Sequence, residues 1–258
     1  MTAEKTRVSD DGRMPLMEHL SELRNRIIKI AAAIGLGAIV AWFLYPQIFD
    51  LLLGPYCDLQ GASDEDCRLL QTEPLEVFTV RLKIAGYGGI ALAMPVILWQ
   101  ICRFITPGLY SHEKKYAIPF VVSALVLFVL GAALAYYTLP RALDFLVNIG
   151  GEGFVTQFRP APYFQLITYM MLAFGVGFEF PIVLIFLQLA GVITARTLRD
   201  FRRYAIVGIV VLVAVITPSG DPYSLAILSI PMYLFYEISI LIGMLLTRRK
   251  DRAEARGA

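Results

Sequence analysis

Charge is scarce in this chain of 258 residues. Only 17% of the residues are charged, whereas 57% are hydrophobic, and the mean hydropathy is +0.65. A water-soluble domain of this size needs more charge to cover its surface, so the composition favours long membrane-spanning runs. An early apolar run is also missing, because the first 26 residues are polar and charged. We therefore expect no cleaved secretion signal and an N-terminus that stays in the cytoplasm.

Residue types that bind metals or catalyse reactions are equally sparse. Three cysteines and two histidines give little material for a metal site, and we predict no metal, cofactor or nucleic-acid partner. His19 and His112 belong to no protease-like pattern, and no phosphate-binding loop is present, which argues against an enzyme. Cys57 and Cys67 share one polar segment, and a disulfide between them is one of two open readings if that segment faces an oxidising compartment.

Six apolar runs account for the hydrophobicity. A bilayer core of roughly 30 Å needs about 20 helical residues, and four runs reach that length. The fifth gives only about 18 Å of helix before Thr217-Pro218, and the sixth gives about 25 Å if Pro231 sets its start. The sequence predicts an all-α fold with six transmembrane helices, of which the fifth and sixth are short. The runs are Ile27–Tyr45, Ile84–Arg103, Ala117–Leu139, Tyr163–Ala190, Ala205–Ile216 and Pro231–Thr247.

Positive charge marks one side of the predicted bundle. Eighteen of the 23 Lys and Arg residues fall in the two terminal segments and the loops on their side, and the other five fall opposite. Because cytoplasmic loops carry the excess of Lys and Arg, both termini are predicted to be cytoplasmic. The outer loops 46–83 and 140–162 are long enough to cap the outer face. The predicted parts are a cytoplasmic segment (1–26), a membrane domain (27–247) and a basic cytoplasmic tail (248–258).

The segment from Met14 to Ile28 has the pattern of an amphipathic helix. Its apolar positions recur at helical spacing, which predicts a helix at the membrane surface before the first span. Glu22 and Arg26 on its polar face are spaced for an i, i+4 ion pair. The apolar positions are Leu16, Leu20, Leu23 and Ile27.

Four motifs occur in order between about residues 14 and 247. They are HLSELRNR at 19–26, FITPGLYSHEKK at 104–115, AFGVGFEFP at 173–181, and a set that runs from Thr217-Pro218 through Asp221-Pro222 to Ile230-Pro231-Met232-Tyr233. Together they resemble the TatC family, the signal-peptide receptor subunit of the twin-arginine (Tat) protein translocase. Four matches in register are far more specific than one.

The resemblance implies a receptor for signal peptides that carry paired arginines. In TatC proteins the N-terminal segment and the first inner loop form the recognition site, so Glu22 and Glu113 are the candidate arginine-binding carboxylates. A carboxylate accepts the planar fork of a guanidinium in bidentate fashion, whereas lysine is a point charge. Without the family, Glu113 would be read as an exposed acid beside Lys114 or Lys115, and Glu22 as the partner of Arg26. The other residues implied in this site are Arg24, His112 and the apolar floor of Phe104, Pro107 and Leu109.

The resemblance also implies partners and a location. It implies TatA- and TatB-type single-span proteins, self-association in the receptor complex, contact with lipid, and export of folded precursors across the bacterial cytoplasmic membrane. The chain has no nucleotide motif, and the family implies the proton-motive force as the energy source. A small-solute transporter is the alternative, although six spans without an internal repeat argue against it.

Glu179 interrupts the fourth apolar run beside Gly175, Gly177 and Pro181. A charge at the bilayer centre costs on the order of 3 kcal/mol or more, so this side chain is expected to face a polar cavity or a partner helix, where the glycines and the proline bend the helix. A protonated structural glutamate bound to a neighbouring span is the alternative. Glu237 has the same two readings.

Asp221 and Pro55 match an acidic and a proline position of the TatC family. They join Glu179 in the predicted intramembrane polar or partner site. Four residues after Asp221 the chain has Leu225, where some members of the family have glutamine. A partner contact through that glutamine therefore does not carry over to this chain.

Overall fold

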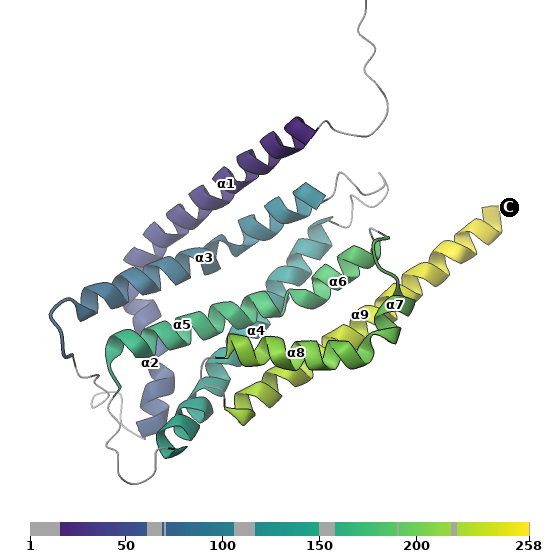
Figure 1. Cartoon of the computed structure of the whole chain (residues 1–258). Helices are drawn as coiled ribbons and strands as arrows, with labels where there is room; N and C mark the ends of the chain where they lie inside the picture. The colour runs from purple at the N-terminus through teal and green to yellow at the C-terminus, as the bar shows by residue number, and fades with distance from the viewer. Residues whose placement is uncertain are drawn as a thin grey trace, which may run out of the picture.

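A computed structural model describes residues 16–60, 69, 71–105, 117–149, 158–189, 191–217 and 221–257. Within these ranges the chain is helical with no strand, so the all-α prediction is confirmed. Figure 1 shows the helices as an elongated bundle. The helices are α1 (Leu16–Phe43), α2 (Tyr45–Gln60), α3 (Glu76–Ile105), α4 (Ala117–Ile149), α5 (Pro160–Gly177), α6 (Phe180–Leu189), α7 (Ala195–Asp200), α8 (Arg202–Ile216) and α9 (Pro222–Gly257).

Five segments of the described chain are long and apolar enough to cross a membrane. The fourth of them combines α5 and α6, and it is the most buried of the five. Between the fourth and fifth segments lies α8, whose 15 residues give about 22 Å of helix, short of a bilayer core of roughly 30 Å. The prediction of a short fifth span fits this length. The segments are Leu20–Phe43, Glu76–Phe104, Ile118–Ile149, Pro160–Leu189 and Pro222–Leu245.

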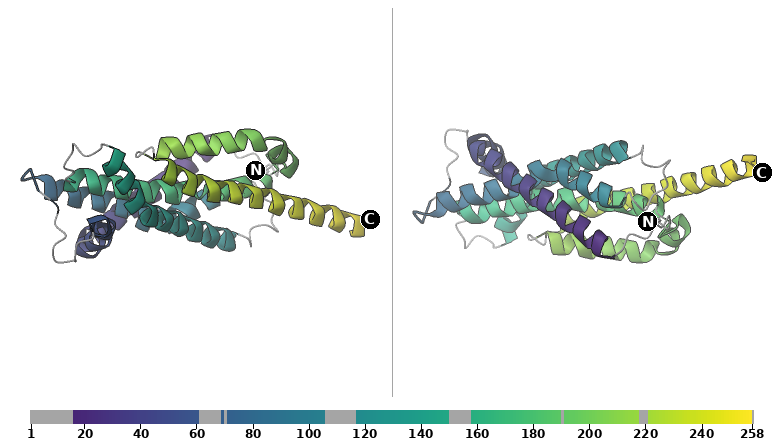
Figure 2. Two further views of the ribbon diagram at one scale, coloured as in Figure 1. Left: turned by 90° about the horizontal axis from the view of Figure 1, so that it is seen from below. Right: turned by 90° about the horizontal axis from the view of Figure 1, so that it is seen from above.

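The last helix is longer than predicted. Helix α9 begins at Pro222, with Pro231 in its interior, so the expected start at Pro231 is wrong. Proline suits the first turn of a helix because its fixed φ angle is helical and an N–H group there would have no partner within the helix. An interior proline is tolerated in a membrane helix because neighbouring groups form hydrogen bonds with the backbone groups that it frees. Helices α8 and α9 lie side by side, and the end of α9 extends beyond the other helices (Figure 2).

The first helix is also continuous where a division was predicted. The amphipathic segment expected at the membrane surface and the first span form one helix, α1, because no proline or glycine occurs between residues 16 and 34 to separate them. Leu20, Leu23 and Ile27 of the predicted stripe are exposed on it. Helices α3 and α4 likewise extend past the outer ends of their apolar runs, to Glu76 and Ile149.

Helix α2 closes the end of the bundle that is predicted to face outward. It runs across the ends of α3 and α5 rather than alongside them (Figure 1). Two tyrosine hydroxyls hold it there: Tyr163 donates to the carbonyl of Leu52 at 2.7 Å and Tyr136 donates to the carbonyl of Leu51 at 2.9 Å. The predicted outer cap is therefore, in its first part, a helix. Pro55 is buried inside it.

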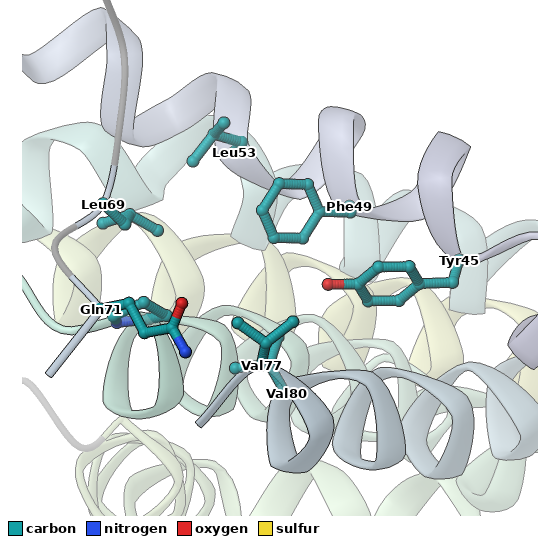
Figure 3. Close-up of a pocket in the computed structure, with 8 residues that line it drawn as sticks. Tyr45, Phe49, Leu53, Leu69, Gln71, Val77 and Val80 are labelled. Atoms are coloured by element: carbon teal, nitrogen blue, oxygen red, sulfur yellow. The ribbon is translucent and has the colours of Figure 1, made fainter. Parts of the chain in front are cut away.

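A cavity of about 320 Å³ lies between α2 and the outer turns of α3 and α5. Figure 3 shows Tyr45, Phe49 and Leu53 of α2 on one side, with Val77 and Val80 of α3 opposite. Partial burial raises the pKa of the Tyr45 hydroxyl above its usual value. The remaining lining residues are Leu69, Gln71 and Pro160.

Helices α1 and α3 approach so closely that two glycines are required. A Cβ atom on Gly89 of α3 would lie 2.6 Å from the backbone nitrogen of Ala38, and one on Gly37 of α1 would lie 2.6 Å from the carbonyl oxygen of Gly89. Small residues at such crossings allow membrane helices to gain van der Waals contact over a long interface. The first two spans therefore form one closely packed pair.

Replacing Gly89 with alanine should separate this pair. The added methyl group meets backbone atoms that cannot move independently, so we expect the free energy of unfolding to fall by about 1–3 kcal/mol. Thermal unfolding of the purified protein in detergent measures the change. Gly86→Ala on the same helix is the matched control, because a Cβ atom there meets nothing within 4 Å. Equal midpoints for the two variants would show that the close approach is not required.

Candidate functional site

One guanidinium group joins the N-terminal part of α1 to the C-terminal end of α3, on the side predicted to be the inner one. Arg26 of α1 donates to the carbonyl oxygens of Gln100 at 3.1 Å and Arg103 at 3.0 Å, both in the last turns of α3. The same side chain forms an ion pair with Glu22, one helical turn earlier. Its guanidinium carbon also lies 5.8 Å from the centre of the Phe104 ring. The predicted Glu22–Arg26 pair is therefore part of a contact between two helices.

The predicted recognition residues fall partly within the described chain. Glu22 is half-buried beside Arg26, Arg24 is exposed, and Phe104 is half-buried at the end of α3. Glu22 and Phe104 are thus brought to the same inner end of the bundle, although 82 positions separate them in the sequence. Sequence reasoning did not include Arg26 in the site. The remaining predicted residues, Pro107, Leu109, His112 and Glu113, lie outside the described residues.

The helix of the fourth span is interrupted at Glu179, as the adjacent glycines and Pro181 predict. Helix α5 ends at Gly177 and α6 begins at Phe180. Pro181 has no N–H to offer the carbonyl of Gly177, and its ring disfavours a regular helix there. The backbone N–H groups at the break still find partners, because Phe178 donates to Phe174 at 2.9 Å and Glu179 donates to Val176 at 3.1 Å.

The carboxyl group of Glu179 lies at an apolar groove between α3, α4 and α6. Glu179 is only 9% exposed, and its Oε1 atom has no hydrogen-bond partner among the described residues. The groove has a volume of about 340 Å³, and Glu179 is its one ionisable carboxyl group. Its apolar lining includes Met94 and Ile97 of α3, Phe120 of α4 and Phe186 of α6. The alternative interpretation, in which Glu179 is a structural residue hydrogen-bonded to a neighbouring span, is therefore not supported for its Oε1 atom.

Glu237 differs from Glu179 in having partners. Arg202 at the start of α8 donates to its Oε2 at 2.5 Å, and Tyr233 donates to its Oε1 at 2.9 Å. The ion pair joins the short helix α8 to α9. These contacts therefore support the interpretation of Glu237 as a structural residue that is bound to a neighbouring helix.

Asp221 has a local role that the sequence analysis did not assign. Its side chain is fully buried, and Oδ1 accepts a hydrogen bond of 2.6 Å from the backbone N–H of Ser224. Asp221 thus caps α9, whose first residue is Pro222. Leu225, at the position of the absent glutamine, packs against the core. A partner contact through Asp221 remains a prediction.

Cys57 of α2 is disulfide-bonded, and Cys102 is a thiol buried in α3. Cys67, which the sequence analysis named as the partner of Cys57, lies outside the described residues. In the part of the chain that is described, no group of three His, Cys, Asp or Glu side chains could hold a metal ion.

Comparison with known proteins decides the family. The model of the family described as "Sec-independent protein translocase protein (TatC)" matches residues 18–231. The chain belongs to the TatC family. A TatC from Frankia casuarinae is 41% identical over 256 residues, which cover 96% of this chain and 70% of that protein. A TatC from Aquifex aeolicus is 41% identical over 248 residues, which cover 93% of this chain and 99% of that protein.

Solved TatC structures have the same fold. A crystal structure of the twin-arginine translocase receptor TatC in DDM has a TM-score of 0.73 and 39% identity, and the match covers 87% of this chain and 99% of that one. A second crystal structure of that receptor gives a TM-score of 0.72 and 40% identity. This TatC is accordingly a multi-pass protein of the bacterial cytoplasmic membrane and a component of a protein translocase. Membership decides against the solute-transporter alternative.

The cap at Asp221 can be separated from a partner role. Asp221→Ala removes the acceptor for the Ser224 N–H and should lower the free energy of unfolding by about 1 kcal/mol, whereas Asp221→Asn keeps an acceptor and should stay near wild type. Thermal unfolding in detergent measures both variants. If Asp221→Ala unfolds like wild type but no longer supports export, the side chain acts through a partner and not as a cap.

Proposed function

We propose that this TatC is the receptor for twin-arginine signal peptides of folded precursors, with Glu22 and Glu113 as the carboxylates that bind the two arginines. The observation that carries the proposal is the position of Glu22. It lies half-buried near the start of α1 and pairs with Arg26, which binds the last turns of α3, from which the chain continues directly to Glu113. The solved relatives, described as twin-arginine translocase receptors, support the same function.

The chemistry of Glu22 suits a guanidinium ligand. It already pairs with Arg26, so the surroundings of this carboxylate accommodate a planar cation at a partly desolvated position. Phe104 supplies an apolar face at the same place, and a guanidinium stacks on an aromatic ring better than an ammonium does. Arg24, Pro107, Leu109 and His112 complete the proposed site. No catalytic step is proposed.

A second part of the proposal concerns partners. Single-span TatA- and TatB-type proteins dock near the groove at Glu179, where a buried carboxyl oxygen lacks a hydrogen-bond partner among the described residues. A polar side chain on a partner helix would satisfy that oxygen in a medium without water. The short helix α8 thins the neighbouring bilayer, which aids the passage of folded cargo driven by the proton-motive force. The receptor complex holds more than one copy of TatC.

The receptor proposal predicts a loss of discrimination when both carboxylates are neutralised. Wild-type protein should bind a paired-arginine signal peptide more tightly than its paired-lysine variant. Glu22→Gln and Glu113→Gln should each weaken arginine-peptide binding about tenfold or more, because each removes a charge-assisted hydrogen-bonded pair. Titration of labelled peptide into the full-length protein in lipid nanodiscs measures both affinities.

Asp200→Asn is the matched control for these two variants. It removes an exposed carboxylate from α7, on the predicted cytoplasmic side, and should leave both peptide affinities unchanged. A double variant, Glu22→Gln with Glu113→Gln, that still separates the two peptides and exports folded passengers would contradict the receptor site.

The thinning proposal is tested by the length of α8. Inserting about one turn of leucines should extend α8 toward the full bilayer thickness and impair export of a folded reporter, while membrane insertion stays normal. Export assays in cells without their own TatC, with immunoblots of membranes, give both readouts. Val211→Leu with Val215→Leu is the control, because these exposed positions become leucine at unchanged length. Normal export by the lengthened protein would count against thinning.

A further inference from the structure

Arg26 caps a helix to which it does not belong. The last four carbonyl groups of an α-helix have no partner within the helix, and a cation at that end is favoured by the helix dipole. Arg103 is one of these four residues in α3, and its carbonyl accepts from Nη2 of Arg26. Nη1 of the same guanidinium binds the carbonyl of Gln100. The side chain of Arg26 is only 12% exposed, and its bond to Gln100 is partly buried, whereas its bond to Arg103 lies at the exposed end of the helix.

The nitrogen that caps α3 is also the one that holds Glu22. Nη2 of Arg26 donates both to the carboxylate of Glu22 and to the carbonyl of Arg103. The position of the Glu22 carboxylate is therefore tied to the end of α3 and not only to its own helix. Directly after α3 comes the segment that carries Glu113.

We propose that Arg26 is a positioning residue for signal-peptide recognition, an inference that rests on the proposed receptor function. By bridging Glu22 to the last turn of α3, it holds the first arginine-binding carboxylate at a fixed place relative to the start of the segment that carries the second. An arginine of a signal peptide then meets a Glu22 carboxylate whose position relative to α3 is set in advance. Pre-organisation of this kind improves affinity by lowering the entropy lost on binding.

Lysine cannot replace Arg26 in this role. The guanidinium reaches three acceptors, on Glu22, Gln100 and Arg103, with a rigid planar fork of donors. A lysine would place one compact ammonium group at the same site and could keep the charge but not the bridge. Arg26→Lys therefore tests the bridging geometry while it keeps the positive charge.

Arg81 provides a matched control for the helix contact alone. It lies on α3 at the opposite end of the same helix pair, where its Nη2 donates at 3.2 Å to the carbonyl of Trp42 in the last turn of α1. Its guanidinium carbon lies 4.4 Å from the centre of the Trp42 ring. Arg81→Lys therefore disturbs the same α1–α3 pair by the same chemistry, far along the helices from Glu22.

The experiment measures binding of the paired-arginine peptide and its paired-lysine variant to full-length protein in nanodiscs. Arg26→Lys should weaken the arginine peptide about tenfold and narrow the ratio between the two affinities, whereas Arg81→Lys should leave the ratio at its wild-type value. In a Glu22→Gln background, Arg26→Lys should cause less than about a twofold further change, because its effect passes through Glu22. Thermal unfolding of each variant shows how far the helix pair is disturbed.

The outcomes distinguish this inference from the function on which it rests. If Glu22→Gln weakens binding but Arg26→Lys binds like wild type, the positioning role is wrong and the receptor function stands. If Arg26→Lys binds the arginine peptide more tightly than wild type, Arg26 competes with the peptide for Glu22. If Arg26→Lys and Arg81→Lys lose the same affinity for the arginine peptide, Arg26 contributes only to helix packing. A wild-type protein that does not separate the two peptides would overturn the receptor function and this inference with it.

Discussion

The hydrocarbon core of a membrane offers no hydrogen bonds, and this constraint determines where the chain of this TatC departs from a regular helix. At the break between α5 and α6, the N–H groups of Phe178 and Glu179 are satisfied within the preceding turn. At the start of α9, the buried carboxylate of Asp221 accepts the N–H of Ser224. At both of these places a nearby acceptor therefore satisfies the backbone N–H groups. The carboxyl group of Glu179 differs, because its Oε1 is among the buried side-chain atoms that have no hydrogen-bond partner in the described part of the chain.

The same need for partners explains how α1 and α3 are paired. At the inner end an arginine of α1 binds the last turn of α3, and at the outer end an arginine of α3 binds the last turn of α1. Between them, Gly37 and Gly89 bring the two backbones into contact. Two antiparallel helices thus satisfy each other's ends and pack closely along their length. A unit held in this way presents Glu22, the proposed arginine-binding carboxylate, from a rigid scaffold, as a preorganised binding site requires.

Hydropathy predicted most of the membrane architecture but not the ends of the helices. An apolar run records how far a segment lies in hydrocarbon, and a helix continues beyond it wherever the backbone has no reason to stop. For this reason α4 passes through Pro140 and α9 passes through Pro231. The residues that do start α9 were present in the sequence, since aspartate followed by proline is the pattern of an N-cap and a first helical turn.

In the candidate site, too, features that depend on neighbouring residues could be predicted from the sequence, whereas contacts between distant residues could not. Glu179 was predicted at a helix break because the carboxyl group, the glycines and Pro181 are neighbours in sequence. The bond from Arg26 to Arg103 joins positions 77 residues apart, and no local pattern contains it. The structure also separates two glutamates that the sequence treats alike. Glu237 pairs with Arg202 and Tyr233, whereas one oxygen of Glu179 is left at an apolar groove. Glu237 already pairs with groups on α8 and α9, so of these two glutamates Glu179 is the one at which an arriving polar group gains more.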